Sequence, residues 1–225
     1  MHPYITPISN TFKENANELN AANAKAYLLH QFPFFGIKSP VRRALSKAHY
    51  NAYPINSLSE LETIVMECWQ LPEREYQYFA LELIGFHQKL WTQEIISLIE
   101  YCLITKSWWE TVDGICSEVL DKYFRLFPQQ IKTITSHWNA SDNIWLQRCS
   151  IMFQRTFKKN TDTVLLTNYI LHCKNSKEFF VRKAIGWALR EYSKTNPEWV
   201  IEFVTQNELH PLSRREALKR IGSNL

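Results

Sequence analysis

The sequence predicts an all-α chain, a curved α-solenoid of HEAT-like antiparallel helix pairs that forms a single domain over residues 1–225. Three observations favour this fold class. The chain has only 5 glycines beside 13 Phe, 10 Tyr and 8 Trp, which indicates long helices and few tight turns. No stretch alternates polar and apolar residues for long enough to predict a sheet. Similar residues also recur every 33 to 35 positions, which is typical of a repeat of two helices.

Capping residues and prolines predict where the helices begin. An opening segment rich in Ala and Asn predicts one or two helices, which are broken by Pro33 and Gly36. Most later helices are expected to begin after a Ser, Thr, Asn or Asp residue or at a proline, because these residues are preferred at helix N-termini. The expected capping residues include Ser57, Ser141 with Asp142, Thr161 with Asp162, Asn196 and Ser213. The predicted helices cover about residues 10–31, 39–49, 57–69, 73–88, 92–105, 107–125, 128–138, 141–157, 161–172, 178–194, 197–206 and 213–221.

The repeat also predicts a register. Arg148, Arg182 and Arg215 each lie early in a predicted helix, at intervals of 34 and 33 residues. One step of 35 residues back from Arg148 reaches Asp113, and a further step of 35 reaches Tyr78. In a HEAT-like stack, the second helix of each pair lines one concave face. We therefore expect these positions in one groove, where Asp113 is the only acid of the series.

The segment KSWWETVDG (106–114) carries the most unusual combination of residues. Trp109 and Asp113 are four positions apart, so they share one face of a helix. An aromatic plate beside a carboxylate suits a flat, cationic group. The structural alternative is that tryptophans of helical repeats belong to the core and that Asp113 is a charge near a helix N-terminus.

Positive charge gathers in the C-terminal part of the chain. Residues 1–140 hold 12 Lys and Arg against 14 Asp and Glu, whereas residues 141–225 hold 14 against 8. Basic residues with interspersed aromatic rings are typical of a surface that binds a nucleic-acid backbone, and an ordinary solvated surface is the alternative. The candidate contacts in this region are Trp145, Arg148, Lys158, Lys159, Arg182, Arg190 and Arg215.

No motif in the sequence indicates metal or cofactor chemistry. The seven histidines form no HxH, HxxxH or HExxH pattern and the five cysteines form no CxxC pair, so we expect no metal site. The chain has no Gly-rich phosphate loop, and no cofactor is expected. Cysteines within apolar helical patterns indicate reduced thiols in a cytoplasmic protein. No segment is long and apolar enough to cross a membrane, and we expect a monomer.

A single carboxylate in a phosphate-binding groove has a chemical use. Cleavage of an N-glycosidic bond generates an oxocarbenium-like sugar, and a nearby carboxylate stabilises this positive charge and orients the attacking water. Tryptophan faces attract a cationic, N-alkylated base. Such a base leaves without a general acid, because its departure neutralises its charge. These residues therefore indicate hydrolysis of an N-glycosidic bond at Asp113.

Four segments carry a resemblance to a known family: SWWETVD (107–113), IWLQR (144–148), FVRKAIGWALREY (180–192) and FPFFGIKSPVRR (32–43). In these segments the chain resembles the DNA alkylation repair family of HEAT-repeat DNA glycosylases, the AlkD-like proteins. The resemblance implies a curved solenoid that holds duplex DNA on a basic concave face. It also implies release of cationic N3- or N7-alkylated purines, which leaves an abasic site, without turning the base into a deep pocket.

The resemblance also implies roles for individual residues. Asp113 matches the catalytic carboxylate, and Trp109 and Trp187 match the aromatic pair that faces the sugar and backbone of the lesion. Arg148 matches an arginine that grips a phosphate, and Tyr27 matches an aromatic residue of the N-terminal helices. The expected partner is duplex DNA that contains alkylated purines. Two other functions stay open: a non-catalytic relative that recognises damaged or branched DNA, and a HEAT-like scaffold for protein partners.

Overall fold

The structure of the chain is a computed structural model that describes residues 1–221. These residues form helices joined by short connections, with no β-strand among them, so the all-α prediction is confirmed. Contacts divide the chain into two compact units, of which the first spans Met1–Lys106 and the second begins at Ser107. A single domain over residues 1–225 stays a prediction.

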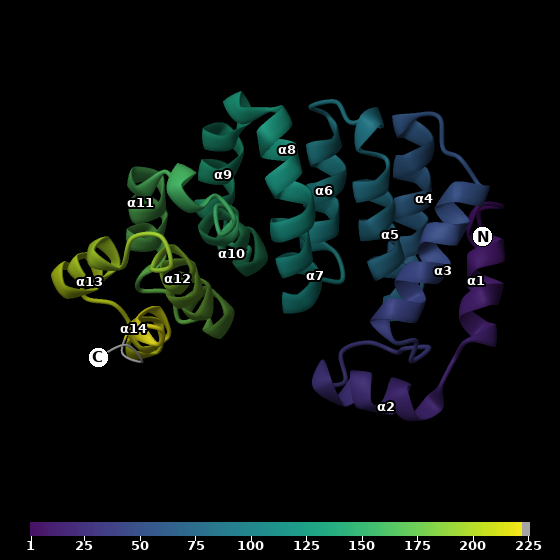
Figure 1. Ribbon diagram of the computed structural model, residues 1–225, viewed down its shortest axis with the longest axis horizontal. Coiled ribbons are helices and arrows are strands. Elements are labelled where there is room, and N and C mark those ends of the chain that lie inside the picture. Colours follow the sequence, from purple (N-terminus) through teal and green to yellow (C-terminus); the bar gives the residue numbers. More distant parts are fainter. Residues whose placement is uncertain (222–225) are drawn as a thin grey trace. The chain divides into compact units, whose positions relative to one another are not determined.

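The first unit packs its helices around an aromatic core. Helix α3 contacts α1 and α5, and α4 contacts α5 and α6, whereas α2 buries none of its residues. Phe12, Trp69 and Phe79 are fully buried between these helices. The helices of this unit are α1 (Ile5–Glu14), α2 (Glu18–Tyr27), α3 (Ser39–Ala52), α4 (Leu58–Gln70), α5 (Arg74–Phe86) and α6 (Ile95–Ile104) (Figure 1).

A buried carboxylate on α5 holds the loop that leads into α3. Glu75 accepts hydrogen bonds from three consecutive backbone N–H groups, those of residues 35–37, at 2.8 to 3.2 Å. Gly36 has a φ of 85°, and a Cβ at this position would collide with the backbone of Asn17 and Ala21. Only glycine therefore lets the loop pass the start of α2 in this conformation.

We expect Glu75→Gln to lower the free energy of unfolding by about 1.5–3 kcal/mol. The amide group would turn an N–H donor toward backbone N–H groups and would remove the negative charge that they share. Urea unfolding of the two proteins measures this difference. Glu14→Gln on the exposed surface of α1 is the control, and an equal change in both variants would contradict the prediction.

The second unit is built of helix pairs in two rows. Helices α9, α11 and α13 form one row, and α10, α12 and α14 form the other, which α7 extends through its contact with α10 (Figure 1). The helices are α7 (Trp109–Gly114), the π-helical segment η2 (Ile115–Leu120), α8 (Asp121–Leu126), α9 (Ile131–Asn139), α10 (Ile144–Met152), α11 (Thr163–Cys173), α12 (Phe179–Tyr192), α13 (Pro197–Gln206) and α14 (Pro211–Leu218).

The register predicted from the repeat is confirmed within this unit. Asp113 lies on α7, Arg148 on α10, Arg182 on α12 and Arg215 on α14. Contacts join α7 to α10, α10 to α12, and α12 to α14. The four positions therefore follow one row of helices, as a two-helix repeat requires.

Several helix boundaries differ from the prediction. Helix α1 begins at Ile5, because the apolar side chains of Ile5 and Ile8 pack into the core ahead of the predicted start. The helix expected over 141–157 ends at Met152, where the chain passes into a series of turns. The helix expected over 107–125 is continuous but widens into a π-helical segment directly after Asp113 and Gly114.

Side-chain caps begin six of the fourteen α-helices of the described chain, and two of these caps differ from the prediction. Ser57, Asp162 and Asn196 cap α4, α11 and α13 as predicted. Asn143 caps α10 in place of the expected Ser141 and Asp142. The prediction of a Ser213 cap for the last helix is wrong. His210 caps that helix, and the buried Ser213 hydroxyl donates to the backbone oxygen of Arg182 on α12 at 2.8 Å.

Candidate functional site

The candidate site in the second unit is built around an ion pair between Asp113 and Arg148. Both carboxylate oxygens of Asp113 accept hydrogen bonds from Arg148, one from Nε at 2.8 Å and one from Nη2 at 3.0 Å. Arg148 also donates from Nη1 to the backbone oxygen of Phe180 at 2.8 Å. The side chain of Asp113 is 13% exposed and that of Arg148 is 4% exposed. A bidentate guanidinium–carboxylate contact of this kind fixes the plane of the carboxylate.

The resemblance implies that Arg148 grips a phosphate, and this contact stays a prediction. The repeat places Arg148 on the predicted row, but its guanidinium lies inside the unit and bonds to α7 and α12. An arginine is tolerated there because the carboxylate and a carbonyl oxygen satisfy its donors. Arg148 therefore fastens three neighbouring helices around Asp113.

Two tryptophans stand at the same cavity as the carboxylate. Trp109 begins α7 one turn before Asp113, and Trp187 lies near the middle of α12. The cavity is open and has a volume of about 320 Å³, near the lower end for ligand pockets. Its lining consists of Trp109, Asp113, Arg148, Phe179, Phe180, Lys183, Trp187 and Arg190. Five of these residues were site candidates from the sequence.

Helix α12 supplies three cavity residues that the sequence analysis did not single out as site candidates. Phe179 is 56% exposed at the start of the helix, although it is a large apolar residue. Phe179, Lys183 and Trp187 are spaced four apart, so they share one face of the helix. Because Trp187 was already a site candidate, this spacing could have identified Phe179 and Lys183 from the sequence. Phe180 also lines the cavity and gives its backbone oxygen to Arg148.

Trp145 packs into an aromatic cluster beside the cavity. Its ring centre lies 4.9 Å from that of Phe180 and 5.8 Å from that of Trp108, and the rings of Phe180 and Trp108 are 5.2 Å apart. Trp145 is half-buried and is not among the residues that line the cavity. Its position supports the wall formed by Phe180. Direct contact between Trp145 and DNA stays a prediction.

A carboxylate on α14 holds two cations of the site. Glu216 accepts from Lys183 Nζ at 3.1 Å and from Arg190 Nη1 at 2.9 Å. Burial raises the pKa of Glu216, but Lys183, Arg190 and Lys219 outweigh this effect, so the pKa is lowered from its ordinary value of 4.5. The ionised carboxylate therefore stabilises the fold at neutral pH.

We expect this contribution to disappear as the pH falls below about 4.5, through the lowered pKa of the folded state. Glu216→Gln should accordingly reduce the loss of unfolding free energy between about pH 5 and about pH 3. Urea unfolding at a series of pH values measures the slope. Glu208→Gln, at an exposed position, is the control, and equal slopes in the wild type and Glu216→Gln would contradict the prediction.

The remaining candidates lie outside the cavity. Arg182 donates from Nε at 2.7 Å to a backbone oxygen of the loop before α12, so it braces that loop. Arg215, Lys158 and Lys159 are exposed on the second unit, and the two lysines begin a short 3₁₀ turn. Tyr27 is 70% exposed at the end of α2 in the first unit. Their contacts with DNA stay predictions.

Neither a metal-binding group nor a membrane-spanning helix is present in residues 1–221. Within this range no group of three or more His, Cys, Asp and Glu side chains is arranged to hold a metal ion. Nor does any helix of the described chain have the length and apolar character needed to cross a membrane. The cysteines at 68, 102, 116, 149 and 173 are all buried and free.

Paired helices with an acid, two tryptophans and basic side chains on one row define a HEAT-like repeat protein with a candidate reaction site. The family described as "DNA alkylation repair enzyme" matches residues 8–221, and the chain belongs to this family. The resemblance seen in the sequence is therefore confirmed. Membership supports an enzymatic role in the repair of alkylated DNA, and with it binding to DNA.

Solved structures agree with this assignment. A predicted DNA alkylation repair enzyme from Enterococcus faecalis is 35% identical, has a TM-score of 0.83, and is matched over 91% of this chain and 96% of that chain. AlkD2 from Streptococcus mutans is 18% identical with a TM-score of 0.60, over 77% of this chain and 85% of that chain, so its likeness concerns the fold alone. No curated protein matches the chain at a significant level.

Proposed function

We propose that this protein is a monofunctional DNA glycosylase that hydrolyses the N-glycosidic bond of cationic N3- or N7-alkylated purines in duplex DNA and leaves an abasic site. One observation carries the proposal: a carboxylate held in a fixed plane by Arg148 lies at an open cavity that Trp109 and Trp187 also line. The family's role in repair of alkylated DNA supports the choice of substrate.

Asp113 stabilises the sugar as the bond breaks. The departing base takes the bonding electrons, which neutralises its positive charge and leaves positive charge on the sugar ring. A preorganised carboxylate stabilises such charge without rearranging during the reaction. Each carboxylate oxygen accepts one bond from Arg148 and retains further lone pairs, which are available to orient the attacking water.

The surrounding residues hold the damaged nucleotide. The faces of Trp109 and Trp187 pack against the lesion and attract its positive charge. Lys183 and Arg190 each give one bond to Glu216 and keep other donors, which suit phosphates on either side of the lesion. The cavity is open, which supports release of the base without a deep base-binding pocket.

A second candidate function is a non-catalytic relative that binds damaged or branched DNA. The observation that favours it is the same pair, because Asp113 gives both oxygens to a buried arginine. A buried arginine needs a negatively charged partner, and an aspartate in that position stabilises the fold without taking part in a reaction. Both functions predict binding that weakens as salt is raised.

Base release from methylated duplex DNA tests the proposal. We expect the protein to liberate 7-methylguanine or 3-methyladenine, with no release from unmethylated duplex and no change when a metal chelator is added. DNA binding without release from any alkylated purine would favour the second candidate. A gel-shift titration completes the test, because absence of DNA binding at low salt would contradict both and favour a protein-interaction scaffold.

A further inference from the structure

Arg155 touches Trp187 from outside the site cavity. Its Cζ lies 4.3 Å from the centre of the Trp187 ring, nearer than the 5.8 Å of Arg148 Cζ. Arg148 lines the site cavity with Trp187, whereas Arg155 does not. Of the two guanidinium groups over the indole, the nearer one therefore belongs to a residue that does not line the site cavity.

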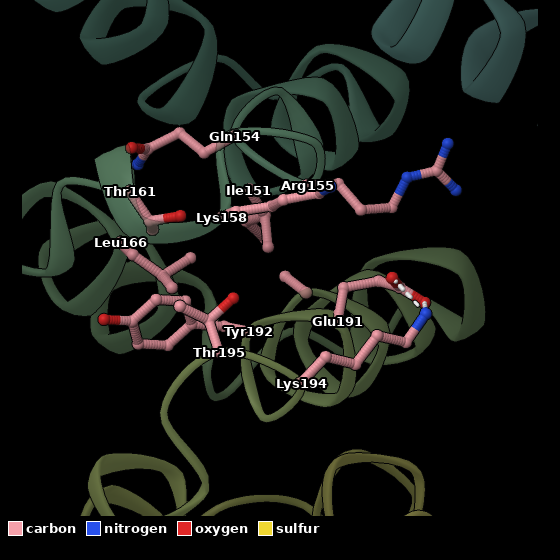
Figure 2. Close-up of a pocket in the computed structure, with 11 residues that line it drawn as sticks. Ile151, Gln154, Arg155, Lys158, Thr161, Leu166, Glu191, Tyr192, Lys194 and Thr195 are labelled. Atoms are coloured by element: carbon pink, nitrogen blue, oxygen red, sulfur yellow. Dashed lines mark hydrogen bonds and ion pairs between the residues drawn. The ribbon is translucent and has the colours of Figure 1, made fainter.

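Arg155 also borders a second cavity. It has a volume of about 380 Å³ and is bordered by the end of α10, the turns that follow it, and α12 (Figure 2). Arg155 lines it, and in Figure 2 its side chain runs along the rim with the guanidinium pointing away from the end formed by Thr161 and Leu166. Trp187 does not line this cavity, so Arg155 borders the second cavity with its side chain and contacts the indole with its guanidinium.

The contact with Trp187 is also what positions Arg155. Other arginines of this unit are fixed by acceptors: Arg148 by Asp113 and Arg190 by Glu216. Among the described residues, the Arg155 guanidinium has no such ion pair or hydrogen bond, and it packs instead on the face of the Trp187 indole. A planar guanidinium stacks well on an aromatic ring, and a lysine does so less well.

We propose that Arg155 is a positioning residue for Trp187: its guanidinium packs on the indole and keeps the ring in place at the site cavity. The proposal rests on the proposed function, in which Trp187 packs against the lesion. Arg155 itself touches neither the reacting atoms nor Asp113. Loss of the contact removes this support from the indole, and small displacements of a positioning group slow a reaction strongly.

Single-turnover base release at saturating DNA is the first measurement. Arg155→Ala is expected to lower this rate by about tenfold or more, and Arg155→Lys to restore part of it. Lys194→Ala is the matched control, because Lys194 lines the same cavity and pairs with Glu191 rather than with a ring. A change in DNA affinity alone, with an unchanged rate at saturation, would overturn the proposal, as would an equal loss of rate in Lys194→Ala.

Fluorine NMR of protein labelled with 5-fluorotryptophan tests the same contact without catalysis. Comparison with Trp187→Phe assigns the Trp187 resonance. We expect this resonance to shift or broaden in Arg155→Ala and to stay unchanged in Lys194→Ala, with both variants folded by circular dichroism. An unchanged resonance in Arg155→Ala would overturn the positioning role. If the resonance moves while the wild type releases no base, the proposed function fails and the role of Arg155 stands.

Discussion

Asp113→Asn is expected to lower the rate of base release by about 10²-fold or more while DNA binding is largely retained. The substitution keeps the shape of the side chain and one carbonyl oxygen, but it removes the negative charge. A neutral amide cannot offset the charge that develops on the sugar. Release of 7-methylguanine under single-turnover conditions measures the rate, and a gel-shift titration at the same salt concentration measures binding.

The same change also disturbs the fold, so stability has to be measured beside activity. Removal of one partner from a buried ion pair costs about 3–5 kcal/mol when the other charge is left without compensation. The carbonyl oxygen of the introduced amide can still accept from Arg148, so we expect a smaller loss. Assays are therefore run below the melting temperature of the variant, which thermal unfolding gives.

Arg148→Met is the matched control for this prediction. It breaks the same pair, but it keeps the negative charge of Asp113, which Arg148 then no longer orients. If the carboxylate is the chemical group, Arg148→Met should retain more base release than Asp113→Asn at equal stability. Equal activities in the two variants, or near wild-type release by Asp113→Asn, would contradict a catalytic role for Asp113.

Gly186→Ala is expected to lower the free energy of unfolding by about 1–3 kcal/mol. Its helix α12 crosses α14 so closely that a Cβ would lie 2.5 Å from Glu216 Cβ and 2.7 Å from the backbone oxygen of Ser213. Neither atom can rotate away, because one belongs to the backbone and the other is bonded to it. Helix α14 must therefore shift, and it carries Glu216 with it.

The sign of this effect is a strict test. In an exposed helix interior, glycine to alanine stabilises a protein by about 1 kcal/mol, so the usual expectation runs in the opposite direction. Urea unfolding of the variant measures the difference. We also expect slower base release, since Trp187 follows the substituted residue and Glu216 holds Lys183 and Arg190. A variant as stable as the wild type would show that the two helices separate without cost.

The sequence predicted the helices and the row on which the site lies, because both follow from local signals. Apolar periodicity and capping residues mark helices over ten or so positions, and the repeat interval links Asp113 with Arg148. What the interval could not predict was the direction of the Arg148 side chain. Its burial depends on acceptors from neighbouring helices, and only the assembled unit brings the carboxylate and the Phe180 carbonyl within reach.

The contacts that α14 makes with α12 could not be predicted from the sequence either. Ser213 carries the residue type of an N-cap, but its hydroxyl bonds to α12 instead, so a local rule gave way to a tertiary contact. Glu216 lies 33 residues from Lys183 and holds it only because Gly186 lets the two helices approach. No local pattern marks such a contact. The spacing of Phe179, Lys183 and Trp187, by contrast, was visible in the sequence.

The π-helical segment behind Asp113 is a place where this chain can change in length. A π-turn accommodates one more residue than an α-helix in the same stretch, and here the Ser117 hydroxyl donates to the backbone oxygen of Asp113 at 2.8 Å within the widened turn. Deletion of one residue from Ile115–Leu120 would therefore make the helix regular and keep the residues on either side in register, whereas the same deletion in a regular α-helix would rotate the residues after it by about 100°. Tyr123 and Phe124, which are buried, would then stay in the core while Asp113 kept its orientation. Single-codon deletions are therefore expected to be tolerated better here than in the regular helices of the unit.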